Sequence, residues 1–248
     1  MNGCEKMRVG IFDSGLGGLV VLKEILKKYP NNEFIYYGDT LNVPYGNKSI
    51  EELLEITTKI INYFNEQRVD LIIIACGTVS SNCYFELCKI TSIPILDIIS
   101  PTIRYLNNSS YNKIGVIGTL RTIESGVFTK KLPNKKVSQV ASVDLASIIE
   151  NNTILENMET INNYLNLLDK DIECLVLGCT HYPILLPILK NKLSIPFIDM
   201  GKCLVKVLKL KNDSKPSINL YFSKLDDKVI KNINQIIPFD KQITELIL

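Results

Sequence analysis

A weak internal repeat restricts the fold of this 248-residue chain more than any other feature of its sequence. The segment RVGIFDS at residues 8–14 recurs as KIGVIGT at 113–119, and DLIIIAC at 70–76 recurs as ECLVLGC at 173–179. A third pair, SIPILD and SIPFID, follows in the same order and at nearly the same spacing. A single match could arise by chance because apolar strands resemble one another, but three in the same order predict two similar halves.

Short apolar runs alternate along the chain with stretches of helical periodicity. Residues 8–12, 33–39 and 70–76 are expected to form strands. The apolar positions of residues 19–29 fall at helical spacing, and residues 49–67 open with a serine cap and an acidic first turn, which predicts a second helix. This alternation is typical of an α/β fold with mostly parallel sheets flanked by helices.

Composition argues against several classes of partner and location. The net charge of +2 gives no electrostatic reason to expect binding to nucleic acid or to a membrane. The longest apolar run, Leu71 to Cys76, is far too short to span a bilayer. Residues 1–15 carry charges but no apolar stretch long enough for a signal peptide. We therefore expect a cytoplasmic protein whose seven cysteines are reduced thiols.

Two of these cysteines end matching strands of the repeat. Cys76 closes one apolar run and Cys179 closes its counterpart, and ligands of open α/β sheets bind at the carboxyl ends of strands. If the halves face each other across a cleft, one thiolate can remove a proton from one face of a carbon while the other thiol protonates the opposite face. The sequence thus indicates a reaction that inverts a centre. The other cysteines are expected to be core residues: Cys4, Cys83, Cys88, Cys174 and Cys203.

Charged and hydroxyl side chains near these strand ends are further candidates. His181 is the single histidine of the chain and follows Cys179 and Thr180, so we interpret it as an acid/base assistant. Asp13 follows the first strand, where its carboxylate could bind an ammonium group or adjust a thiol.

Two loops allow a structural interpretation as well as a functional one. The glycines of residues 15–18 permit close approach of a ligand to the backbone, and the amides that open the next helix could bind a carboxylate; a simple strand-to-helix turn explains them equally well. Val20 stands where a dinucleotide-binding loop requires its third glycine. By itself, Pro44-Tyr45-Gly46 indicates a turn that carries Tyr45 as a surface aromatic.

Two other chemistries find weaker support. A hydrolase with Cys76 as nucleophile and His181 as base leaves Cys179 unexplained. A zinc site needs closely spaced cysteines or histidines, and the chain offers one histidine and the pair Cys83 and Cys88 on a helical stretch.

Four motifs occur in order along the chain: FDSGLGGLVVL (12–22), YYGDTLNVPYGNKS (36–49), ACGT (75–78) and LGCTHYPIL (177–185). In this order and spacing they resemble the glutamate racemase branch of the aspartate/glutamate racemase family. The similarity extends from Val9 to Asp199. It favours glutamate over aspartate as substrate, because aspartate-type relatives usually carry Glu in place of His181.

The resemblance implies a cofactor-independent, metal-free racemase, often a homodimer, that interconverts L- and D-glutamate and supplies D-glutamate for peptidoglycan. It also implies two domains related by a pseudo-twofold axis with the active site between them; we expect these to comprise residues 1–98 with 206–248, and 99–205. Carried over by position, the catalytic bases fall on Cys76 and Cys179, an assisting acid falls on Glu150, and substrate contacts fall on Asp13, Ser14, Tyr45, Gly46, Gly77, Thr78, Thr180 and His181.

The chain departs from this family at two places. Gly77 stands where the family has Asn, whose side chain can donate a hydrogen bond to a charged group of the substrate. Residues 220–229 resemble a degraded form of a Gly-Asp-containing segment. Both departures leave open a homologue that binds without turnover, or a racemase with a shifted substrate. The missing donor predicts that Gly77→Asn raises kcat/KM for glutamate, unless the glycine serves the backbone through a positive φ.

Overall fold

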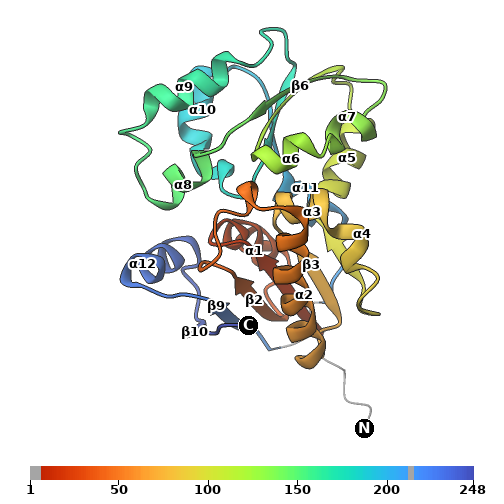
Figure 1. Cartoon of the computed structure of the whole chain (residues 1–248), viewed down its shortest axis with the longest axis vertical. Coiled ribbons are helices and arrows are strands. Elements are labelled where there is room, and N and C mark those ends of the chain that lie inside the picture. The colour runs from red at the N-terminus through yellow and green to blue at the C-terminus, as the bar shows by residue number, and fades with distance from the viewer. Residues whose placement is uncertain (1–6, 212–214) are drawn as a thin grey trace.

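The computed structural model describes residues 7–211 and 215–248, so the expectation for Cys4 lies outside the described residues. Two sheets organise the chain, and all their strand pairs are parallel (Figure 1). In spatial order, the first sheet comprises β10 (Gln242–Glu245), β9 (Ser217–Phe222), β2 (Glu33–Gly38), β1 (Arg8–Asp13), β3 (Leu71–Ile74) and β4 (Ile95–Asp97). The second comprises β6 (Lys136–Ala141), β5 (Lys113–Gly118), β7 (Cys174–Gly178) and β8 (Phe197–Asp199).

The strand order confirms the repeat read from the sequence. β2, β1, β3 and β4 lie in the same order as β6, β5, β7 and β8, and each matched pair of segments occupies the same place in its sheet. The last two strands return to the first sheet and pair beside β2. Because both sheets are parallel, the carboxyl ends of β1 and β3 lie at one edge, as do those of β5 and β7.

The helices cover the faces of both sheets. They are α1 (Gly17–Lys28), α2 (Ile50–Glu66), α3 (Gly77–Asn82), α4 (Tyr84–Leu87), α5 (Ile99–Asn107), α6 (Leu120–Glu124), α7 (Val127–Lys131), α8 (Leu145–Glu150), α9 (Met158–Asn166), α10 (Leu186–Lys192), α11 (Met200–Val207) and α12 (Asp227–Ile236), with short 3-10 turns η1 (Tyr45–Asn47) and η2 (Tyr182–Leu185). The expected cap of α2 is present as a capping box, in which Ser49 accepts from the Glu52 amide and the Glu52 carboxylate accepts from the Ser49 amide. No helix within residues 7–211 and 215–248 has the length and apolar character of a membrane span.

A shared core holds the two halves together. One cluster of buried apolar side chains extends from β1 and α1 through α5 and α11 to β5 and β7, with Leu22, Ile103, Leu204 and Val176 among its members. Each such side chain contributes about 1.5–3 kcal/mol on full burial. The halves are therefore packed against each other, and the edge that carries the strand ends is positioned by this packing.

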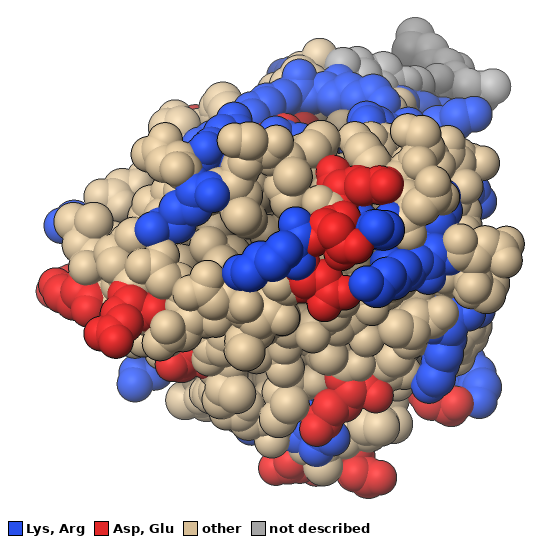
Figure 2. All heavy atoms as spheres, turned by 90° about the horizontal axis from the view of Figure 1, so that it is seen from above, with Lys and Arg blue, Asp and Glu red and all other residues tan. Residues whose placement is uncertain are grey.

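The cysteines that were expected in the core do not all lie there. Cys83, Cys174 and Cys203 are buried as expected, but Cys88 is exposed, and its assignment to the core was wrong. Cys88 follows the short α4, whose Leu87 is the residue that faces the core, so the next position turns to solvent. On the face seen in Figure 2, Lys and Arg side chains are interspersed with Asp and Glu.

Candidate active site

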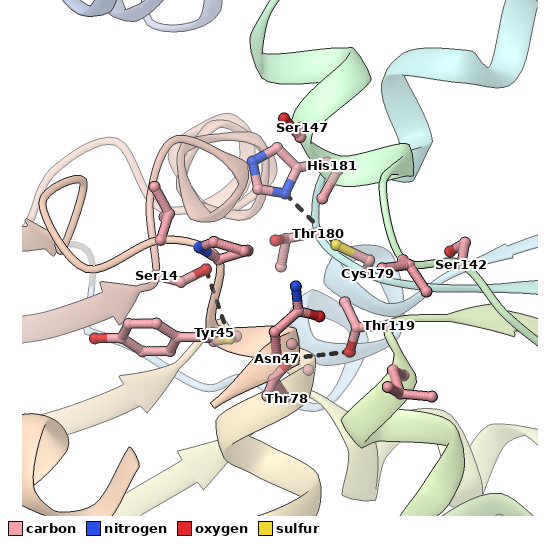
Figure 3. Close-up of a pocket in the computed structure, with 18 of the residues that line it drawn as sticks. Ser14, Tyr45, Asn47, Thr78, Thr119, Ser142, Ser147, Cys179, Thr180 and His181 are labelled. Atoms are coloured by element: carbon pink, nitrogen blue, oxygen red, sulfur yellow. Dashed lines mark hydrogen bonds between the residues drawn. The ribbon is translucent and has the colours of Figure 1, made fainter. Parts of the chain in front are cut away.

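A cavity of about 260 Å³ lies where the strand ends of the two halves meet (Figure 3). Its volume suits a ligand of amino-acid size, since pockets for larger molecules measure about 300–1,000 Å³. All but one of the residues that the sequence assigned to the site line this cavity. These are Ser14, Tyr45, Gly46, Cys76, Gly77, Thr78, Glu150, Cys179, Thr180 and His181.

The two thiols enter the cavity from equivalent places in the repeat. Cys76 is the N-cap of α3, two residues beyond β3, and Cys179 directly follows β7. Both are buried, with 4 % and 7 % of their surface exposed. The Cys76 thiol donates to Ser14 Oγ over 3.9 Å, while Cys179 Sγ lies 3.5 Å from His181 Nδ1.

His181 joins Cys179 to Glu150 in a short chain of polar contacts. Its Nε2 lies 2.7 Å from Glu150 Oε1, which also accepts from the Leu16 amide at 3.2 Å. Burial disfavours a charged imidazole, but Glu150 and Cys179 outweigh burial and raise the pKa of His181 well above its ordinary value. Burial likewise opposes the charge of Glu150, yet His181 outweighs it and lowers the pKa of that carboxyl. The two form an ion pair that places an imidazolium beside Cys179.

Cys76 has the opposite electrostatic environment. Burial and, after it, the nearby Asp13 carboxylate raise the pKa of Cys76 well above its usual range, and the Val79 amide and Ser14 hydroxyl offset only part of this. The site is therefore asymmetric, with a protonated thiol on one side and a thiol beside an imidazolium on the other. A proton donor and a prospective base thus face the same space.

Asp13 does not line the cavity, although the sequence placed it in contact with the ligand. It is fully buried, and its Oδ2 accepts from the amides of Gly18 at 2.7 Å and Gly15 at 3.4 Å. Thr180 Oγ1 donates to its other oxygen at 3.5 Å. Burial raises the pKa of Asp13, and the charge of His181 and the Gly18 amide offset only part of the shift. In this structure Asp13 positions the loop and Thr180.

The glycine loop packs against the other half of the protein, and Gly15, Gly17 and Gly18 are not among the described residues that line the cavity. A Cβ at Gly17 would lie 2.3 Å from Thr180 Oγ1 and 2.5 Å from His181 Nδ1, and one at Gly15 would lie 2.6 Å from Glu150 Oε1. The amides at the start of α1 do bind carboxylates, but the carboxylates are those of Asp13 and Glu150. The glycines are needed so that the second half can approach this closely.

Tyr45 is buried, so its interpretation as a surface aromatic was also wrong. Its hydroxyl donates to Asp39 Oδ2 at 2.7 Å, and Ser223 Oγ donates to Asp39 Oδ1 at 2.7 Å. Burial and the Asp39 charge raise the pKa of Tyr45 well above its ordinary value. Ser223 lies inside the tail segment that looked degraded, and here that segment supports the cavity wall. Sequence reasoning missed Asp39, although this residue directly follows β2 and therefore stands at a strand end, where functional residues of parallel sheets are expected.

Thr119 is a lining residue that sequence reasoning missed, and the repeat contained the signal for it. The segment 113–119 matches 8–14, so Thr119 is the counterpart of Ser14, and both line the cavity. Thr119 Oγ1 lies 2.9 Å from Thr78 Oγ1, a contact between the two halves. Figure 3 shows Ser142 and Ser147 as further hydroxyls from the second half.

Gly77 lies where the loops of the two thiols touch. A Cβ at this position would lie 2.8 Å from the carbonyl oxygen of Gly178 and 3.3 Å from Met200 Cε. The backbone of Gly77 is not in the left-handed region. Among the glycines of the described residues, Gly126 is the one with a positive φ. The suggestion of a positive φ was therefore wrong, and the glycine is explained by close approach.

The described lining includes no lysine or arginine, so hydroxyls, amides and His181 supply its donors. Among residues 7–211 and 215–248, no three or more His, Cys, Asp or Glu side chains cluster as metal ligands would.

The chain is similar to known proteins over most of its length. Residues 21–208 match the family model described as Asp/Glu/Hydantoin racemase. A glutamate racemase of Aquifex aeolicus is 36 % identical over 225 residues, covering 88 % of this chain and 89 % of the relative. One from Fusobacterium nucleatum is 36 % identical, covering 90 % and 85 %. The crystal structure of Francisella tularensis glutamate racemase in complex with D-glutamate superposes with a TM-score of 0.86 at 28 % identity, covering 98 % of each chain. The motifs, the paired sheets and these similarities together confirm the predicted relationship: the chain belongs to the Asp/Glu/Hydantoin racemase family.

Proposed function

We propose that this protein interconverts L- and D-glutamate by a two-base mechanism with Cys76 and Cys179. The observation that carries the proposal is the pair of buried thiols, one from each half, that line one cavity of amino-acid size. Family membership supports an isomerase, and the relatives named above are glutamate racemases. A separate contact for each thiol also supports the proposal, Ser14 for Cys76 and His181 for Cys179.

In one direction, Cys179 acts as the base. The imidazolium of His181 stabilises negative charge on the Cys179 sulfur, and this thiolate removes the proton from Cα of one enantiomer. Cys76, whose pKa is raised, holds its proton until a carbanion forms and then delivers it to the opposite face. The product leaves behind Cys76 as thiolate and Cys179 as thiol, which is the form that the other enantiomer requires.

Substrate recognition in this proposal relies on neutral donors. Glutamate brings two carboxylates, and the described lining offers hydroxyls and amides for them, including Ser14, Thr78 and Thr119. Hydrogen bonds from neutral donors to a charged group are worth about 1.5–3 kcal/mol each. Asp13 acts through Thr180 and the glycine loop rather than as a direct ligand.

The wider setting belongs to the same proposal. A cofactor-independent glutamate racemase would supply D-glutamate for peptidoglycan, work in the cytoplasm and assemble as a homodimer, with domains of residues 1–98 plus 206–248 and 99–205. The sheets support this division, since the first draws its strands from residues 8–97 and 217–245 and the second from 113–199.

A thiol hydrolase is the second candidate, because Cys179, His181 and Glu150 are arranged as nucleophile, base and orienting acid. Circular dichroism of L- and D-glutamate incubated separately with the purified protein, without added cofactor, tests the main proposal. In heavy water a racemase also incorporates deuterium at Cα. Loss of optical activity from both enantiomers is expected, and no change in either would refute the proposal.

Chelators and dialysis should leave the racemase activity unchanged, whereas thiol alkylation should abolish it and glutamate should protect. The exposed Cys88 will react as well, so the experiment is best done in a Cys88→Ala background, which should retain activity because Cys88 is remote from the cavity lining. Mass spectrometry then identifies which thiol is modified as activity falls. Inactivation without modification of Cys76 or Cys179 would contradict the mechanism, as would loss on chelation that a metal restores.

Replacing Glu150 by Gln should move the alkaline limit of activity to lower pH. In the wild type the raised pKa of His181 keeps the imidazole ring protonated at pH values well above 6.5, the ordinary pKa of histidine. Without the Glu150 charge, burial dominates and the pKa of His181 falls. The imidazolium beside Cys179 then loses its proton at a lower pH than in the wild type. We expect kcat/KM to fall about tenfold or more on the alkaline side.

The same ion pair links stability to pH. The raised pKa of His181 stabilises the fold below about pH 6.5, and this contribution disappears as pH rises through the folded pKa. The lowered pKa of Glu150 stabilises it above about pH 4.5, and this contribution disappears as pH falls through its folded value. Rate profiles and denaturant unfolding of Glu150→Gln, with the exposed Glu86→Gln as control, measure both effects. An unchanged alkaline limit would show that the pair is not part of the reaction.

A further inference from the structure

Asn47, the last residue of η1, lies at the mouth of the cavity with its amide turned inward. The side chain is exposed, yet it belongs to the lining, and in Figure 3 its nitrogen points into the cavity. Neither the repeat nor the resemblance assigned it a role.

Among the described lining residues, three side chains carry N–H donors: Asn47, Asn151 and His181. His181 uses its two ring nitrogens toward Cys179 and Glu150. Asn151 donates to Ser147 Oγ at 3.1 Å and accepts from Lys228 Nζ at 2.6 Å. Asn47 thus offers the uncommitted amide in a cavity whose described lining has no lysine or arginine.

Although exposed, Asn47 sits on a turn that is held from both sides. Tyr45, two residues earlier, is fixed by its hydroxyl to Asp39. Lys48, the next residue, accepts from Arg121 Nε through its carbonyl oxygen at 2.7 Å, a contact from the other half. A donor on an anchored turn loses less conformational entropy when it binds a ligand.

Depth in the cavity decides which group of the ligand Asn47 meets. The reacting Cα must lie between the two buried thiols, and the α-carboxylate is one bond away from it. The side-chain carboxylate of glutamate lies three bonds from Cα and reaches toward the mouth. Building on the proposed racemase activity, we propose that Asn47 donates a hydrogen bond to the side-chain carboxylate of the substrate and thereby contributes to the preference for glutamate over glutamine.

Two variants, one neutral and one negatively charged, test this inference. Asn47→Ala removes the donor and should raise KM and Kd for glutamate about tenfold while kcat stays within about twofold, since the proposed contact is with the side-chain carboxylate, three bonds from the reacting Cα. Asn47→Asp places a negative charge against the carboxylate and should weaken glutamate binding further. Glutamine carries no charge at this end, so its Kd should change by less than about threefold in both variants. Asn134→Ala, an exposed asparagine outside the cavity lining, serves as the control.

Calorimetry with glutamate and glutamine measures the Kd values without requiring turnover, and a racemisation assay gives KM and kcat. A wild type that binds glutamate without racemising it would refute the proposed function and still test Asn47. Equal losses for glutamate and glutamine would overturn the inference, because they would indicate a contact with the α-carboxylate or a role in supporting the turn. Unchanged glutamate binding in Asn47→Ala would overturn it as well.

Discussion

Racemisation should be lost in both Cys76→Ala and Cys179→Ala, with kcat/KM reduced by at least about 10²–10⁴-fold. Each thiol serves one face of Cα, so neither can replace the other. The two enantiomers have equal free energies in water, which requires any loss in kcat/KM to be the same in both directions. Rates in the two directions therefore cannot show which thiol serves which face.

Isotope exchange can make this distinction. A variant with one thiol left can still deprotonate the enantiomer whose hydrogen faces that thiol and return a deuteron from heavy water to the same face. Cys76→Ala and Cys179→Ala should each incorporate deuterium into one enantiomer without inversion, and the two variants should choose opposite enantiomers. Nuclear magnetic resonance of each enantiomer in heavy water measures this exchange.

Two control variants separate the chemistry from general effects of losing a thiol. Cys88→Ala removes an exposed thiol and Cys83→Ala a buried one, and both should still racemise glutamate. Cys83→Ala is expected to lose some stability, as a buried position does when its volume is reduced. Racemisation that persists in both Cys76→Ala and Cys179→Ala would refute the two-base mechanism. Deuterium exchange into the same enantiomer by both variants would contradict the claim that the thiols act on opposite faces of Cα.

Gly77→Asn is expected to lower kcat/KM for glutamate, the reverse of what the missing side-chain donor predicted from sequence. Any Cβ at this position would lie 2.8 Å from the Gly178 carbonyl oxygen, which belongs to the backbone immediately before Cys179. The loop of Cys76 must then move away from that of Cys179. Overpacking of this kind costs about 1–3 kcal/mol, and displacing a reacting group by about 1 Å can cost about 10²-fold in rate.

Gly77→Ala separates the steric effect from the hydrogen bond. Alanine adds the Cβ without a donor, so both variants should be slower than the wild type, and Asn should regain part of the loss if its amide reaches the substrate. Kinetics are compared with thermal unfolding to confirm that each variant is folded. A Gly77→Asn enzyme faster than the wild type would restore the missing-donor hypothesis and show that the loops can separate without penalty.

The sequence by itself determined the sheets and the position of the thiols. Parallel strands buried on both faces are continuous apolar runs, which can be recognised locally, and their repetition predicted two similar α/β halves. Cys76 and Cys179 follow such strands, and strand ends of α/β sheets form ligand sites. The motif resemblance added Glu150, which lies on α8 in a divergent stretch where no local pattern indicates chemistry.

Only the tertiary structure decided what the residues around the thiols contact. Asp13 and the glycine loop looked like ligand-binding elements, yet they bind each other, Thr180 and Glu150, because the second half packs directly onto the loop. Ser223 supports Asp39 across 184 residues of sequence, a pairing that no local pattern reports. Gly77 looked like a lost donor until its distance from Gly178 was known. These contacts join residues whose separation in the chain carries no periodic signal, so they follow from tertiary packing and cannot be read from a local pattern.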